Sequence, residues 1–288
     1  MKGGADLLPK VFETVQRMTR TVKPSDKVDI IVWSESTLPL TTYPRFANEV
    51  AAIAKESDTP VLSGAQARND RTGAEMNSVL LIGIDGATSR YDKQHLVPFG
   101  EYIPYRTLWP DSIAGKSGFD FFPTDLTPGV GSQILSMTTK GSLAPVKAGV
   151  LICYEGVYPY LATAPVAQGA NVLFSLSNDA WSLSHSQREQ HLASVVMRAA
   201  ETRRSIVRST NNGISGVIDA QGRIVAQSPT DSESILVHDV ELRSGLTPYV
   251  RFGDWFVALC CLVAALLFRK SEKLLRKSEK RKKIGAKA

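Results

Sequence analysis

Cysteine is scarce in this sequence, with three residues among 288. Cys260 and Cys261 are adjacent within an apolar run, and Cys153 stands by itself, so there is no Cys-x-x-Cys pair. This pattern argues against a disulfide scaffold and against a zinc site. His185 and His191 are six residues apart, which is not a helical ligand spacing, and we interpret both as surface or loop residues. We therefore expect neither a metal nor a cofactor.

Several familiar motifs are also missing. There is no G-x-S-x-G nucleophile elbow, and there is no Walker or Rossmann glycine pattern, which argues against three large enzyme classes. No apolar stretch follows the first residues, so no signal peptide is expected. The hydrophobic content of 43% and the charged content of 22% are typical of a folded globular protein. The length is sufficient for one large α/β domain.

Uncharged apolar runs are short except for fourteen residues, Trp255–Phe268. A helix of this length spans about 21 Å, less than the roughly 30 Å of a bilayer core. Ten basic residues and two glutamates follow it, so the tail carries +8 and the remaining chain −2. The flanking Trp255 and the basic block favour a transmembrane helix over 252–268 and a cytoplasmic tail over 269–288. A buried core helix, or a nucleic-acid patch in the tail, is the alternative.

This interpretation creates a conflict of topology. With the tail in the cytoplasm, a spanning helix places residues 1–250 on the opposite side of the membrane. Nothing at the N-terminus is suited to carry them across. Either the helix does not span, or membrane helices precede this segment in a longer polytopic protein. We expect the second arrangement.

Helical and strand patterns alternate along the chain, which predicts an α/β protein with mixed sheets. A segment rich in proline, glycine and aromatic residues, 95–127, is long for a connection and is predicted to be a functional loop or lid. The helices are expected over 7–22, around 46–53 and over 187–204, and the strands over 28–33, 61–65, 78–84, 89–92, 147–152, 171–176, 205–209, 214–219 and 224–226.

Three ionisable residues each follow a predicted strand: Glu35, Lys93 and Cys153. Catalytic groups gather where strands end, because rigid strands orient them. Together they suit acyl transfer: the carboxylate takes the thiol proton, the thiolate attacks a carbonyl, and the ammonium stabilises thiolate and oxyanion. Taken singly, each has a simpler interpretation, since a lone cysteine after a strand is commonly a buried small hydrophobe.

The segments around these residues resemble the signatures of the nitrilase (carbon–nitrogen hydrolase) superfamily, and most closely its apolipoprotein N-acyltransferase family. They are WSEST at Glu35, KQHLVPFGEYIP from Lys93 and GVLICYE at Cys153. SNDAW (177–181), RSTNNGISGVID (208–219) and LTPYVRFGDW (246–255) extend the resemblance over about residues 6–268. One departure is SLSH at 182–185, where the family usually has a Phe-Gly-Asp type turn, which affects substrate contacts rather than the triad.

The resemblance implies a nitrilase-like αββα sandwich over 1–250, followed by the transmembrane helix. It implies a catalytic triad of Glu35, Lys93 and Cys153. The supporting or substrate-binding residues that it implies are Asn77, Glu101, Tyr154 and Glu155.

The implied reaction moves an acyl chain from a phospholipid to the α-amino group of an S-diacylglyceryl-cysteine. It proceeds through a thioester on the enzyme at the periplasmic side of the inner membrane. The expected partners are thus a phospholipid donor, a diacylglyceryl-apolipoprotein acceptor and the membrane, and not nucleic acid. Two alternatives stay open: an amidase of the nitrilase type that uses water as acceptor, and an inactive fragment that lacks its membrane bundle.

Overall fold

The computed structural model describes residues 4–38, 44–69, 71–108, 125–139, 145–180 and 184–285. The chain divides into two compact units, residues 1–246 and 247–288, and each is described by itself.

A four-stranded sheet of order β1-β2-β3-β4 forms one layer of the larger unit. Its strands are β1 (Ile31–Val32), β2 (Val61–Arg68), β3 (Glu75–Ile82) and β4 (Thr88–Asp92). β1 pairs with β2 in parallel, and β2, β3 and β4 form an antiparallel meander. The turn at Asp85-Gly86 joins β3 to β4, and Gly86 has a φ of +79°, which glycine adopts without strain.

A six-stranded sheet of order β10-β9-β8-β7-β6-β5 forms the second layer. The central strands β6, β7 and β8 are parallel, so their carboxyl ends meet at one edge of the sheet. The strands are β5 (Leu135–Met137), β6 (Val146–Ile152), β7 (Val172–Asn178), β8 (Ile206–Asn211), β9 (Gly216–Ile218) and β10 (Ile224–Gln227).

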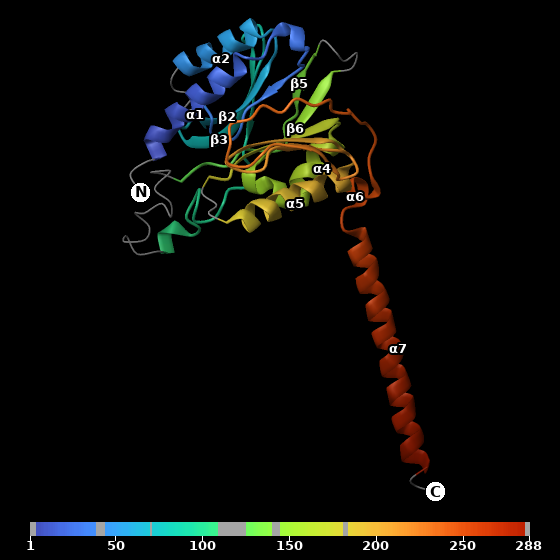
Figure 1. Ribbon diagram of the computed structural model, residues 1–288. Helices are drawn as coiled ribbons and strands as arrows, with labels where there is room; N and C mark the ends of the chain where they lie inside the picture. Colours follow the sequence, from blue (N-terminus) through green and yellow to red (C-terminus); the bar gives the residue numbers. More distant parts are fainter. Residues whose placement is uncertain are drawn as a thin grey trace. The chain divides into compact units, whose positions relative to one another are not determined.

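Helices cover the outer face of each sheet (Figure 1). α1 (Gly4–Thr19) and α2 (Pro44–Glu56) lie over the first sheet, where Phe12 and Val50 join its buried side chains. α4 (Pro159–Ala167) and α5 (His185–Thr202) lie over the second sheet. The inner faces of the two sheets share one core, whose buried members include Leu62, Val79, Val150, Phe174 and Leu176. The layers are therefore helix, sheet, sheet and helix.

Some elements differ from the predictions. The strand expected over 28–33 is reduced to Ile31–Val32, because only these two residues pair with β2. The short strand β5 and the helix α4 were not predicted. α4 has nine residues, contains Pro165 and carries no apolar stripe of helical period, so its sequence gives no helical signal.

The smaller unit consists of α6 (Pro248–Phe252) and α7 (Trp255–Gly285). The hydroxyl of Thr247 caps α6 by accepting a hydrogen bond from the Val250 amide at 3.1 Å. The side chains described along α7, up to Leu274, are exposed, and they are apolar as far as Phe268. Within the described residues, no helix is both long and apolar enough to cross a membrane, which leaves the transmembrane helix predicted over 252–268 without support.

Candidate functional site

The structure brings the three predicted catalytic residues to one place. Glu35 follows β1, Lys93 comes directly after β4, and Cys153 opens the short 3₁₀ helix η3 (Cys153–Val157) directly after β6. Their exposed fractions are 5%, 1% and 4%, so all three are buried. Lys93 Nζ lies 3.8 Å from Glu35 Oε1, and the charges of both residues act on the Cys153 thiol.

Two further predicted residues join this cluster. Glu101 Oε1 lies 2.8 Å from Lys93 Nζ. The Asn77 amide on β3 donates to Glu35 Oε1 at 2.7 Å and to Glu101 Oε1 at 3.1 Å. The Val97 amide donates to the other oxygen of Glu101 at 2.8 Å. One ammonium and one amide thus hold two carboxylates together in the interior, where an uncompensated charge is costly.

The carboxylate of Glu35 is fixed from both sheets. The backbone amide of Asn178, at the end of β7, donates to Glu35 Oε2 at 2.6 Å, and the Asn211 side chain donates to the Glu35 carbonyl at 3.2 Å. From the first sheet, Gly64 on β2 approaches so closely that a Cβ there would lie 2.4 Å from Glu35 Cα. Glycine at this position therefore allows the Glu35 turn to rest on β2.

Burial and neighbouring charges set the protonation of this pair. Burial raises the pKa of Glu35 above its ordinary value, although the charge of Lys93 opposes the shift. Burial alone would lower the pKa of Lys93, but the carboxylates of Glu101 and Glu35 outweigh it and raise this pKa. The result is a firmly protonated ammonium beside a carboxylate that accepts a proton more readily than usual, as a general base requires.

The charge of Lys93 favours the Cys153 thiolate, as expected from the sequence, but it does not decide the resting state. Burial, with the charge of Glu35, raises the pKa of Cys153 to about 12. The charge of Lys93 only partly offsets this shift. The resting residue is therefore a neutral thiol, and its proton has to leave for Glu35 as the sulfur attacks.

The backbone at Cys153 has a φ of +50°, in the left-handed region that residues other than glycine rarely adopt. Glu155, which is fully buried, supports this turn by accepting the Ile152 amide at 2.8 Å. Its other oxygen accepts the amides of Gln94 and His95 at 2.7 and 3.2 Å. Glu155 thereby ties the turn that carries Cys153 to the segment that follows Lys93.

Tyr154 has a different surrounding from the other predicted residues. Its ring packs edge-on against Tyr158, with centroids 5.1 Å apart, and Tyr158 stacks with His95 at 3.9 Å. These rings form an aromatic group beside the site rather than a part of the carboxylate cluster.

Two residues behind the nucleophile, His191 and Arg208, were not among the predicted site residues. His191, interpreted as a surface or loop residue, lies on α5 with its side chain 12% exposed and contacts Asp179 and the Cys153 carbonyl. Arg208 on β8 is buried and pairs with Asp179 at 3.0 Å. The interpretation of His191 was therefore wrong. Residues 109–124 of the predicted lid, and residues 182 and 183 of the departure at 182–185, lie outside the described residues.

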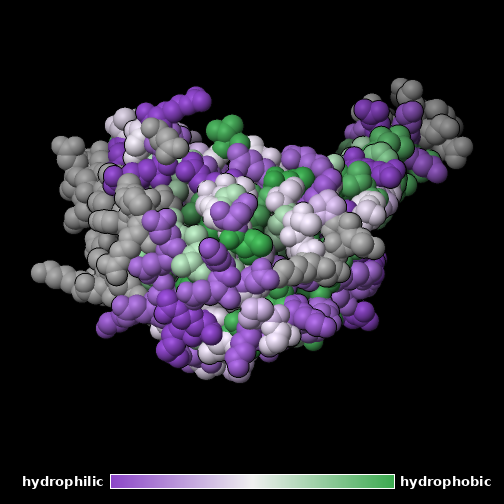
Figure 2. Space-filling model, turned by 90° about the horizontal axis from the view of Figure 1, so that it is seen from above, coloured by the Kyte–Doolittle hydropathy of each residue, from purple (hydrophilic) through white to green (hydrophobic). Residues whose placement is uncertain are grey.

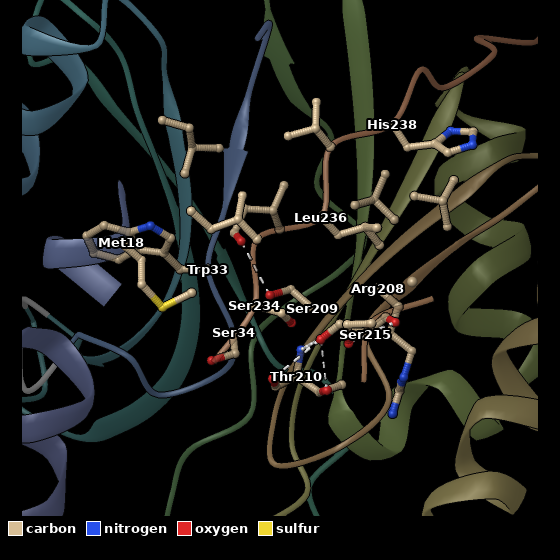
Figure 3. Close-up of a pocket in the computed structure, with 18 of the residues that line it drawn as sticks. Met18, Trp33, Ser34, Arg208, Ser209, Thr210, Ser215, Ser234, Leu236 and His238 are labelled. Carbon is tan, nitrogen blue, oxygen red and sulfur yellow. Dashed lines mark hydrogen bonds between the residues drawn. The ribbon is translucent and has the colours of Figure 1, made fainter. Parts of the chain in front are cut away.

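A cavity of about 940 Å³ lies between the sheets, along α1, β1, β8 and the segment 228–242 (Figure 3). Ser34 and Arg208 line it, whereas Glu35, Lys93 and Cys153 do not. The cavity and the buried cluster therefore adjoin at these two residues but are separate features. The face of the larger unit seen in Figure 2 is mostly hydrophilic, with small hydrophobic patches.

This fold and buried cluster agree with a family assignment from sequence. Residues 5–245 match the carbon-nitrogen hydrolase family, so the chain belongs to that family. Among solved structures, a carbon-nitrogen hydrolase from Helicobacter pylori G27 has a TM-score of 0.59 and 17% identity, covering 79% of this chain and 82% of that one. The nitrilase-like fold predicted from sequence is confirmed.

Among curated relatives, the chain is similar to apolipoprotein N-acyltransferases. It is 35% identical over 272 residues to that of Geobacter metallireducens, covering 90% of this chain and 49% of the relative. It is 36% identical over 240 residues to that of Pseudomonas aeruginosa LESB58, covering 82% and 45%. The predicted resemblance is thus confirmed, and the chain spans about half the length of these relatives.

Proposed function

We propose that this chain carries the catalytic site of an apolipoprotein N-acyltransferase. In this reaction an acyl chain passes from a phospholipid to the α-amino group of an S-diacylglyceryl-cysteine. The observation that carries the proposal is the buried Cys153 thiol beside the Glu35–Lys93 pair, in a chain similar to enzymes of that name. The proposed catalytic residues are Glu35, Lys93 and Cys153.

The first half of the reaction forms a thioester. The Cys153 sulfur attacks the ester carbonyl of the phospholipid while its proton passes to Glu35. Lys93 stabilises the oxyanion of the tetrahedral intermediate. The carbon–oxygen bond of the ester then breaks, and Glu35 returns the proton to the departing lysophospholipid oxygen.

The second half transfers the acyl group to the acceptor. The neutral amine attacks the thioester carbonyl and gives a proton to Glu35, the carbon–sulfur bond breaks, and Glu35 reprotonates the sulfur. Glu101 and Asn77 hold the side chains of Glu35 and Lys93 in position, since Asn77 donates a hydrogen bond to Glu35 and Glu101 forms an ion pair with Lys93. Glu155 would hold the turn that carries Cys153, and Tyr154 would line the path by which substrates reach it.

We also propose that the smaller unit brings the site to the membrane. Residues 1–250 would be the periplasmic catalytic domain, 252–268 the membrane-inserted segment and 269–288 a cytoplasmic tail. Support comes from the exposed apolar side chains at the start of α7, such as Phe256 and Leu262, and from the basic residues after them. A reporter fused after Ala288 should stay cytoplasmic in cells, and labelling of Cys153 by membrane-permeant reagents alone would contradict this topology.

Mass spectrometry tests the acyl transfer. The intact protein is incubated with phospholipid and no acceptor, and is then treated with hydroxylamine. A hydroxylamine-labile acyl mass on the peptide that holds Cys153 is expected, while Cys153→Ala should lack it. The matched control replaces both exposed cysteines, Cys260 and Cys261, with alanine and should keep the adduct.

The same assay separates acyl transfer from hydrolysis. An amidase of the nitrilase type would share the triad but pass the acyl group to water, and no observation on this chain favours it. Adding an S-diacylglyceryl-cysteine peptide should discharge the thioester into an N-acyl peptide. Normal acylation of that peptide by Cys153→Ala protein would overturn the proposal.

A further inference from the structure

We propose that His191 is a positioning residue for the nucleophile, donating a hydrogen bond from Nε2 to the Cys153 carbonyl while its Nδ1 lies against the ion pair of Asp179 and Arg208. This role rests on the proposed use of Cys153 as the nucleophile. It extends the site from the triad to a second buried group on the opposite side of the turn.

The contacts of His191 fix its orientation. Its Nε2 lies 2.9 Å from the Cys153 carbonyl oxygen, and its Nδ1 lies 3.1 Å from Asp179 Oδ1. A carbonyl oxygen only accepts, so Nε2 carries a hydrogen and donates it. The imidazole therefore spans directly from the carboxylate to the backbone of the nucleophile.

Asp179 is itself firmly held. It is 2% exposed, Arg208 Nη2 donates to its Oδ2 at 3.0 Å, and Ser177 Oγ donates to its Oδ1 at 2.7 Å. Burial raises the pKa of Asp179, but hydrogen bonding by His191 and the charge of Arg208 outweigh burial and lower it to about 2. Asp179 is thus an ionised anchor at any ordinary pH.

The turn needs such support, because Cys153 adopts a left-handed φ of +50°, which is strained for a residue other than glycine. Glu155 holds the amide of Ile152 before it, and His191 holds the carbonyl of Cys153 after it. Gly156 lets α5 approach closely enough, since a Cβ there would lie 2.9 Å from Val195 Cγ2.

The rate of alkylation of Cys153 by iodoacetamide at pH 9 tests this role without any acyl donor. Peptide mass spectrometry follows Cys153, and the exposed Cys260 and Cys261 serve as internal controls. His191→Leu should slow alkylation of Cys153 by about tenfold, near the upper end of the scale for one lost hydrogen bond. The rates at Cys260 and Cys261 should not change.

His191→Gln provides the rescue, because its amide can donate to the Cys153 carbonyl, and its rate should lie within about threefold of that of the unmodified protein. A merely structural role predicts the opposite change, since a loosened fold exposes the buried thiol and speeds its alkylation. Alkylation of His191→Leu at or above the unmodified rate would overturn the proposal, as would a Gln variant as slow as the Leu variant. Failure of phospholipid to acylate Cys153 would instead contradict the proposed function alone.

Discussion

Replacing Lys93 with methionine would leave two buried carboxylates without the ammonium that they share. Lys93 Nζ lies 2.8 Å from Glu101 and 3.8 Å from Glu35, and its side chain is 1% exposed. At an effective dielectric constant of about 20, these separations correspond to gross attractions of about 6 and 4 kcal/mol. Desolvation of the lysine offsets much of this, so we expect a loss of about 3–5 kcal/mol in the free energy of unfolding at pH 7.

The loss should depend on pH in a definite direction. Burial already raises the pKa of Glu35 in the folded protein, and removing the charge of Lys93 raises it further. A carboxyl group whose pKa is higher in the folded than in the unfolded state destabilises the fold as pH rises above the unfolded value. The destabilisation of Lys93→Met should therefore be full at neutral pH and shrink below about pH 4, where the carboxyl groups are protonated in both states.

Urea unfolding of the 288-residue chain at several pH values provides the measurement. Lys55→Met, at the exposed end of α2, is the matched control and should stay within about 0.5 kcal/mol of the unmodified protein. Equal stability of Lys93→Met and the unmodified protein at pH 7 would refute the reasoning, as would a destabilisation that does not diminish in acid.

Three further outcomes follow from the same geometry. Glu35→Gln should lower the rate of thioester formation at least about 10²-fold in single-turnover assays, because the glutamine side chain cannot take the thiol proton. In the unmodified protein the same rate should fall on acidification, with a midpoint above the ordinary carboxylate pKa of 4.5, since burial raises the pKa of Glu35. A midpoint of this fall at or below pH 4.5 would contradict the expectation. Gly64→Ala would place a Cβ 2.4 Å from Glu35 Cα, so it should lower the free energy of unfolding by about 1–3 kcal/mol and also slow acylation. Unchanged stability and rate for Gly64→Ala would show that the Glu35 turn does not rest on β2.

The sequence predicted much of the fold because apolar runs marked most strands and their ends. β6 was expected from 147 to 152 and forms over Val146–Ile152, which places Cys153 at its end. The short β1 was overestimated, since pairing with β2 rather than apolar character sets its length. The protonation state of the Cys153 thiol could not be predicted from the sequence, because its pKa depends on how deeply the fold buries the residue.

His191 shows which signal was overlooked. It precedes Val195 by four residues on α5, and Val195 is fully buried, so the helical period places both side chains on one face. Metal-ligand spacing was the wrong test for this histidine. Its partners, Asp179 and the Cys153 carbonyl, come from other elements and are visible only once the chain is folded.

The buried cluster is not electrically balanced. It holds two carboxyl groups, Glu35 and Glu101, but only one ammonium, Lys93, around a neutral thiol. A thioester on Cys153 is uncharged, so this excess persists while an acyl-enzyme waits for its acceptor. In a poorly screened interior the excess attracts an approaching ammonium, and it offers nothing comparable to neutral water. The arrangement that generates the nucleophile therefore also sorts acceptors by charge: it draws in a protonated amine, which loses its extra proton to solvent before the neutral form attacks and gives its next proton to Glu35.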